Sequence, residues 1–280
     1  MVGRGPWWLL LLCLSCGPAG SAPALDLPDR PRDAPGGDQL ARSIRDLDLA
    51  GREERIYAEI AAGNVPTWLR RLRRVEMTGE VDGVRRRVRF WVTPDYLAVG
   101  SDDDFFLIPL SAQTAQRVAD LVGASLPTPR MVDAIWAAAD VRVDPIRLRP
   151  DEFIGTMPYF ERHDHLLKGQ RLLHDAAPGA FLAGHKLDVV LTPALAAHPG
   201  KVALYGWHRA DGQPIQALYT AASDSLVIFS HGIRLVHRGV LVDGAVRDLW
   251  DVLRDPKLAP ILSDRGVIAR AHYPIPGREP

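Results

Sequence analysis

The chain has 280 residues, with 34 basic and 34 acidic side chains and a formal net charge of zero. This balance argues against a general nucleic-acid-binding protein, which would carry an excess of lysine and arginine. The two cysteines, Cys13 and Cys16, lie close to the N-terminus. The remainder of the chain therefore has no disulfide, no thiolate metal site and no cysteine nucleophile.

The N-terminal residues predict export. Arg4 is the only charged side chain before an apolar run over residues 7–15, which is too short to span a bilayer. Residues 22–24, Ala-Pro-Ala, fit the small-x-small pattern of signal peptidase sites, so we expect a signal peptide over residues 1–24. The alternative is a lipoprotein signal processed at Cys16. The protein would then be periplasmic, extracellular or an outer-membrane lipoprotein, in contact with a membrane only through such an anchor.

After the signal region, residues 25–39 are polar and rich in proline and glycine, which predicts a flexible tether. Residues 40–280 are expected to form a single globular domain, and two lobes joined near residues 144–158 are the alternative. Apolar positions between residues 40 and 62 suit one or two amphipathic helices that end at Gly63 and Pro66.

A β-hairpin follows, since residues 84–92 alternate and residues 81–83, Val-Asp-Gly, supply a turn. Arginines are frequent around it: Arg70, Arg71, Arg73, Arg74, Arg85, Arg86, Arg87 and Arg89. We interpret them as a solvated strand face; a patch for acidic polymers is the alternative. A strand is expected over residues 105–108.

The pattern then predicts helices over residues 113–122, 129–139 and 163–174. Strands are expected at 187–191, 201–207, 215–219 and 227–229, followed by a hairpin at 233–242 that turns at Asp243-Gly244 and a helical tail at 246–262. With helices mainly in the N-terminal half and a mostly antiparallel sheet in the C-terminal half, the predicted class is α+β.

Reactive side chains gather in three segments, 184–188, 205–208 and 230–234, each with a histidine near a glycine and a strand end. The hypothesis assigns acid–base roles to the three histidines and an orienting role to a carboxylate, because imidazole titrates near neutral pH. The proposed catalytic residues are His185, Asp188, His208 and His231, with Asp211 as an alternative orienting group. Lys186 and Arg234 would hold an anionic group. Tyr205, Trp207 and Tyr219 would offer flat surfaces to sugar rings or peptide planes.

The alternatives are structural histidines, a zinc site and paired carboxylates. We expect no cofactor, although His163, His165, His185 and Asp188 are the groups that zinc could use. Asp95, Asp102, Asp133 and Glu152 are candidates for the carboxylates of a glycosidase. The chain has no Gly-x-Ser-x-Gly, no phosphate-binding glycine loop and no His-Glu-x-x-His motif.

Two resemblances concern these segments. Residues 184–188, 205–208 and 230–235 resemble segments of exported bacterial proteins of unknown activity, as do residues 63–139. Residues 230–234, Ser-His-Gly-Ile-Arg, also resemble the Ser-His-Gly-Cys-Ile/Val-Arg signature of L,D-transpeptidases. The nucleophilic cysteine of that signature would fall between Gly232 and Ile233 and is missing, so transpeptidase activity is not expected.

The sequence therefore favours an exported hydrolase acting on peptidoglycan or another polysaccharide of the envelope or extracellular space. The alternative is a non-catalytic, lipid-tethered envelope protein that binds glycan or a partner protein. The sequence does not define an oligomeric state.

Overall fold

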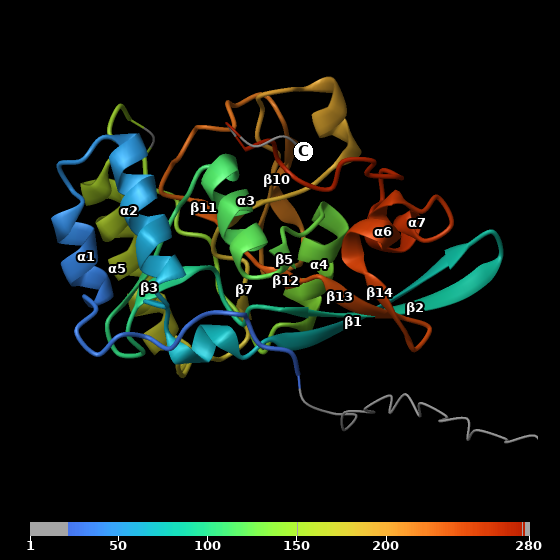
Figure 1. The fold of residues 1–280 in the computed structure, drawn as a ribbon, viewed down its shortest axis with the longest axis horizontal. Coiled ribbons are helices and arrows are strands. Elements are labelled where there is room, and N and C mark those ends of the chain that lie inside the picture. The colour runs from blue at the N-terminus through green and yellow to red at the C-terminus, as the bar shows by residue number, and fades with distance from the viewer. Residues whose placement is uncertain (1–21, 150, 276, 278–280) are drawn as a thin grey trace, which may run out of the picture.

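The computed structural model describes residues 22–149, 151–275 and 277 (Figure 1). The α-helices are α1 (Gly37–Ser43), α2 (Leu49–Ala61), α3 (Ala112–Leu121), α4 (Pro129–Ala138), α5 (Met157–Leu173), α6 (Leu249–Arg254) and α7 (Ala259–Leu262). The strands are β1 (Arg73–Val81), β2 (Val84–Val92), β3 (Ala98–Gly100), β4 (Phe105–Leu107), β5 (Ala124–Ser125), β6 (Val141–Arg142), β7 (Leu182–Ala183), β8 (Leu187–Val189), β9 (Leu204–His208), β10 (Pro214–Tyr219), β11 (His231–Gly232), β12 (Val236–His237), β13 (Gly239–Val242) and β14 (Ala245–Asp248). This distribution and the mostly antiparallel pairing confirm the α+β class.

Residues 25–39 are packed along the domain, which corrects the prediction of a flexible tether. Leu25 is buried, and Arg30 donates hydrogen bonds to Asn64 Oδ1 at 2.9 Å and to the Ala34 carbonyl at 2.7 Å. A Cβ on Gly37 would lie 2.4 Å from the carbonyl carbon of Phe105. Glycine therefore serves a close approach of two backbones here, not flexibility. The preceding residues 1–21, with Cys16 and most of the predicted signal peptide, lie outside the described residues.

The larger sheet is built on two hairpins whose Asp-Gly turns the sequence predicts correctly, although β14 occupies the start of the expected helical tail at 246–262. Its order is β14-β13-β2-β12-β5, with β1 paired to β2. Asp82 and Gly83 have φ angles of 52° and 73°, and Asp243 and Gly244 have φ angles of 50° and 89°. Asp-Gly with two positive φ angles is the preferred turn of a two-residue hairpin, because its twist matches that of the strands.

A second sheet has the order β10-β9-β8-β11. Strand β8 lies between β9, to which it is antiparallel, and β11, to which it is parallel. The expected strand at 227–229 is absent from this sheet. Val227 and Phe229 are buried, but the Phe229 N–H donates to the Ile154 carbonyl instead of a strand. A short buried apolar run resembles a strand in sequence whatever its backbone does.

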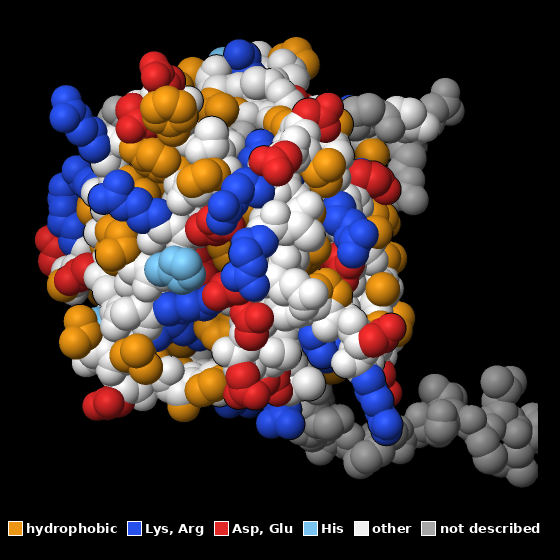
Figure 2. Space-filling view, turned by 90° about the vertical axis from the view of Figure 1, so that its left-hand side faces the viewer, with side chains coloured by type: hydrophobic (Ala, Val, Ile, Leu, Met, Phe, Trp, Pro, Cys, Tyr) orange, Lys and Arg blue, Asp and Glu red, His pale blue; other side chains and the backbone are white. Residues whose placement is uncertain are grey.

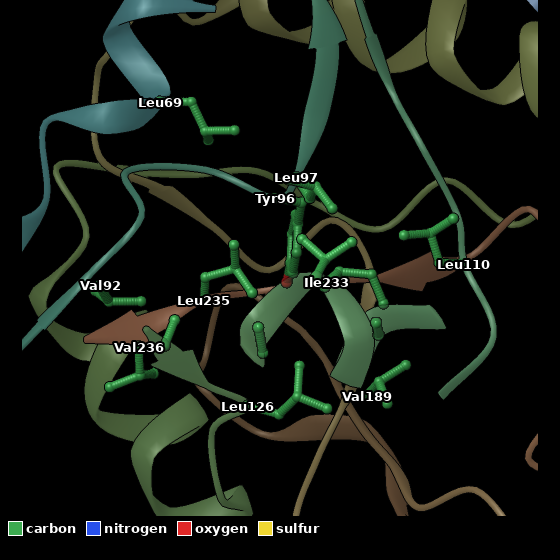
Figure 3. Close-up of a cluster of buried hydrophobic side chains, with 14 of the residues drawn as sticks. Leu69, Val92, Tyr96, Leu97, Leu110, Leu126, Val189, Ile233, Leu235 and Val236 are labelled. Atoms are coloured by element: carbon green, nitrogen blue, oxygen red, sulfur yellow. The ribbon is translucent and has the colours of Figure 1, made fainter. Parts of the chain in front are cut away.

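Most buried hydrophobic side chains form one large core that extends from Leu25 to Tyr273, and Val132, Val190 and Ala203 form a small second cluster. Figure 3 shows the centre of the core, where the ring of Tyr96 stands beside Leu97, Ile233 and Leu235. Tyr96 also carries a hydroxyl into this apolar region, and that group needs a buried partner.

Helices α1, α2 and α5 lie together at one end of the molecule, and the β1–β2 hairpin extends at the other (Figure 1). On the helical face, basic and acidic side chains are interspersed (Figure 2). The Arg45–Glu161 ion pair of 2.7 Å is one contact of this kind. Helix α5 begins six residues before the predicted start, at Met157, with Pro158 in its first turn.

Candidate functional site

The three predicted segments lie side by side in the second sheet. Leu187 of β8 pairs with Gly206 of β9 on one side and with His231 of β11 on the other. The sheet therefore brings together the residues that the sequence singled out, although they are far apart along the chain.

The three histidines of these segments nevertheless have different surroundings. His208 Nε2 lies 2.9 Å from Asp133 Oδ1, whereas His185 Nε2 lies 3.1 Å from Asp95 Oδ1. His231 is fully buried, and burial lowers its pKa to about 4. Burial also lowers the pKa of His185. His185 and His208 therefore lie beside different carboxylates, and the ring of His231 contacts neither of them within hydrogen-bond distance.

One of these contacts reaches the protein surface. Asp133 on α4 is 51% exposed at its side chain, and its Oδ1 accepts hydrogen bonds from both His208 Nε2 and Tyr205 Oη, the latter at 2.8 Å. The imidazole of His208 is buried beneath the carboxylate and stacks on Trp136, with ring centroids 5.8 Å apart. Asp133, His208 and Tyr205 therefore form a surface triad, with two donors converging on one carboxylate oxygen.

An unusual backbone conformation brings Tyr205 and His208 to the same carboxylate. Residues three apart in a regular strand point to opposite faces of the sheet. Gly206 and Trp207 have φ angles of 110° and 57°, and the latter is rare for a bulky side chain. These left-handed residues turn the strand between Tyr205 and His208. Strained backbone of this kind is concentrated at functional sites in proteins.

Behind the surface triad lies a second carboxylate, Asp188. It is buried, and Tyr96 Oη donates to its Oδ2 at 2.9 Å. Burial raises the pKa of Asp188 to about 6, against the opposing charge of Arg234. A carboxyl group with this pKa can exchange a proton near neutral pH, as acid–base groups in enzymes do.

Asp95 holds together a separate ionic cluster in the core. It forms a buried ion pair with Arg171, and it faces His185 at 3.1 Å. Burial opposes ionisation of Asp95, but Arg171, His185 and Arg234 together outweigh it and lower the pKa of this carboxyl. The ring of His185 packs against Tyr96 with centroids 4.9 Å apart, so the two buried groups are neighbours.

Lys186 and Arg234, predicted to hold an anionic group, are both directed into the protein. Lys186 Nζ donates to the Phe229 carbonyl at 2.9 Å, and burial lowers the pKa of this amine to about 8. Arg234 donates to the carbonyls of Thr93 and Leu182, and its guanidinium lies 4.2 Å from the centroid of the Tyr96 ring. Neither cation faces solvent, and both donate to backbone carbonyls inside the fold.

The aromatic side chains that were predicted to contact sugar rings or peptide planes are partly exposed to solvent. Trp207 is half-buried, and its Nε1 donates to the His185 carbonyl at 3.2 Å. Tyr219 on the edge strand β10 is 43% exposed. Of the other carboxylates considered, Asp211 accepts from the Gln213 N–H and closes a local turn. Asp102 accepts from the Thr67 N–H, 35 positions away along the chain.

The arrangement of the described residues does not support the zinc hypothesis. In the part of the chain that is described, no group of three or more His, Cys, Asp or Glu side chains is arranged to hold a metal ion. His163 is buried on α5, whereas His165 is 62% exposed. Residues two apart on a helix face different directions, so this pair cannot converge on one ion.

Three pockets of about 410–530 Å³ lie away from the predicted segments. One contains four arginines of the β1–β2 hairpin, a second lies between residues 192–201 and 267–274, and a third lies between α2 and α3. No helix among the described residues combines the length and apolar character that a bilayer crossing requires.

Sequence reasoning missed the partners Tyr96 and Arg171 and gave Asp133 no mechanism. Asp133 lies on the polar side of α4, opposite the buried Met131 and Ile135, and looks like an ordinary solvated residue in sequence. Its role depends on a contact with a residue 75 positions away. No protein-family model matches the chain, and no curated protein or solved structure is significantly similar to it.

Proposed function

We propose that this protein is an exported hydrolase of an envelope or extracellular polymer, peptidoglycan or another polysaccharide, with acid–base chemistry at the surface triad. The observation that supports it best is the convergence of His208 and Tyr205 on the half-exposed carboxylate of Asp133. Carboxylate–imidazole pairs serve as proton acceptors and donors in hydrolysis.

We assign the catalytic roles of the triad from the solvent exposure of each side chain. Asp133 is the member that a polymer can reach, so it contacts the attacking water, and His208 exchanges the proton through their 2.9 Å contact. As the water oxygen bonds to the acetal or acyl carbon, its proton passes to this pair. The proton then goes to the leaving oxygen or nitrogen as the scissile bond breaks. Tyr205 holds the carboxylate in place.

The test measures soluble reducing ends and free amines released from purified peptidoglycan and neutral and acidic polysaccharides. We expect Asp133→Asn and His208→Gln each to lower the rate by ~100-fold or more, the usual range for acid–base groups. Asp211→Asn is the matched control, since this exposed carboxylate closes only a local turn. Wild-type rates in both site variants would exclude this site, and no release from any polymer by the wild-type protein would exclude the hydrolase.

A second candidate is a non-catalytic protein that binds glycan. The burial of His185, Asp188, His208 and His231 favours it, because all four residues predicted to be catalytic are inside the fold. Sedimentation with insoluble peptidoglycan separates the two functions. Binding that is weakened by Tyr219→Ala, without released product, would support the binding protein over the enzyme.

A further inference from the structure

The exposed face of the β1–β2 hairpin is unusually rich in arginine. Along β2, Val88, Phe90 and Val92 point into the core, and the arginines at 85, 87 and 89 occupy the alternate, solvent-facing positions. The residues opposite them on β1 are Glu80, Thr78 and Glu76. Helices α4 and α7 pack against β1, and this end of the molecule is remote from α1 and α2 (Figure 1).

These side chains surround a hollow rather than a flat face. The pocket has a volume of about 500 Å³. It is lined by Thr78, Arg85, Arg86, Arg87, Arg89, Leu241, Asp243 and Gly244. Strand β13 provides Leu241, which pairs with Arg89 in the sheet and supplies an apolar wall.

The pocket keeps an excess of positive charge after its internal ion pairs are made. Arg89 and Arg87 share the carboxylate of Glu76, at 2.8 and 3.3 Å, and Arg86 pairs with Asp243 at 2.9 Å. Arg85 has no ion pair among the described residues, although Glu80 is opposite it in register. Three of the four guanidinium groups are therefore paired with two carboxylates, and the fourth has no ionic partner among the described residues.

The internal pairs also show which anion suits these arginines. Glu76 accepts a hydrogen bond from Arg89 Nε, and this bond lowers the pKa of its carboxyl. The geometry thus already accommodates a carboxylate between neighbouring guanidinium groups. Since the whole chain has no net charge, an anion would be attracted here by the local cluster and not by a long-range field.

From these observations we infer that the arginine pocket is a binding site for an acidic polysaccharide that carries carboxylate groups. Its uronate-type carboxylates would replace Glu76 and Asp243 as partners of the arginines, and the apolar wall at Leu241 would contact the sugar ring. The site is separate from the surface triad, and its ligand binding does not rest on the proposed hydrolase activity.

The test is direct binding of the mature protein to polygalacturonate at low salt. We expect Arg85→Gln with Arg87→Gln to weaken binding at least tenfold. We expect Arg45→Gln with Arg55→Gln, two comparably exposed and ion-paired arginines beside α1 and in α2, to leave binding unchanged. Neutral dextran should not bind, and salt at about 0.5 M should abolish polygalacturonate binding, because exposed charges are then screened.

Glu76→Gln should change the affinity for polygalacturonate in the opposite direction. It removes the internal competitor of Arg87 and Arg89, so polygalacturonate should bind several-fold more tightly. Equal losses in the two arginine pairs, or weaker binding by Glu76→Gln, would overturn the proposal. Tighter binding of polyphosphate than of polygalacturonate would overturn the assignment to carboxylates. Thermal unfolding of each variant confirms that it is folded.

Discussion

Asp95 is a fully buried carboxylate, and two buried basic groups depend on it. Its replacement by alanine would leave Arg171 without its ionic partner and would remove the carboxylate that lies 3.1 Å from His185 Nε2. An unpaired buried charge typically costs ~3–5 kcal/mol. We therefore expect Asp95→Ala to lower the free energy of unfolding, measured in urea at pH 7, by about that amount.

The same carboxyl should give a pH dependence. Its pKa is lower in the folded than in the unfolded protein, so its ionisation stabilises the fold above the unfolded pKa of ~4. This contribution is lost as the pH falls below that value. The stability difference between wild type and Asp95→Ala should therefore shrink in acid; a constant difference down to pH 3 would contradict the ion pair.

For Asp188 we expect the free energy of unfolding to change with pH in the opposite direction. Burial raises its folded pKa to about 6, above the unfolded value, so the folded protein holds this proton more tightly. The free energy of unfolding should fall as the pH rises from ~4 to 6, by at most ~3 kcal/mol. Asp188→Asn should remove this slope in urea titrations across that range. An unchanged slope in the variant would assign it to other groups.

Gly232 illustrates why glycine accompanies histidine in these segments. A Cβ at this position would lie 2.6 Å from the Tyr96 ring and 2.8 Å from Lys186 Cβ. We expect Gly232→Ala to lower the melting temperature strongly, because overpacking lowers the free energy of unfolding by ~1–3 kcal/mol or more. Gly169→Ala is the control, since nothing lies within 4 Å of that helical position and alanine should stabilise the helix slightly. At this position the absence of a side chain makes room for the ring of Tyr96.

Among the elements, helix α4 connects the fold to the surface triad. Thr128 Oγ1 accepts from the Met131 N–H at the start of this helix and donates to the Leu262 carbonyl of α7. We expect Thr128→Val to lower the free energy of unfolding by ~1–2 kcal/mol, as the loss of an N-cap does. The substitution should also displace Asp133. Polymer turnover should fall with it. Ser111→Ala, which uncaps α3, should lower stability without this loss of turnover.

Most elements could be predicted because their signals are local. The Asp-Gly turns define both long hairpins, and Thr128 with Pro129 marks the beginning of α4. The prediction of a flexible tether was wrong because proline and glycine content reflects only local backbone preferences. Arg30 and Gly37 instead hold this segment through contacts with residues 64 and 105. The parallel pairing of β8 with β11 likewise has no local signal. For the same reason, the sequence identified His208, Tyr205 and Asp133 separately but not the contacts that join them.

For the whole molecule, the sharpest prediction concerns processing. If Cys16 is lipidated, Cys16→Ser should release the protein from the membrane fraction or leave it unprocessed. If cleavage follows Ala24, the same change should alter nothing, because Cys16 leaves with the signal peptide. Intact-mass measurement of the mature wild-type chain decides between them: an unmodified N-terminus at Leu25 would rule out the anchor.

The packing of the N-terminal segment limits the reach of an anchored form. Ala24 already bridges to Arg71, so the chain is fixed to the domain almost from the first described residue. Between Cys16 and Ala22 a fully extended chain spans only ~20 Å. A lipidated protein would therefore be held close against its own bilayer and would act only on polymer within a few nanometres of it, whereas a cleaved protein could work throughout the wall.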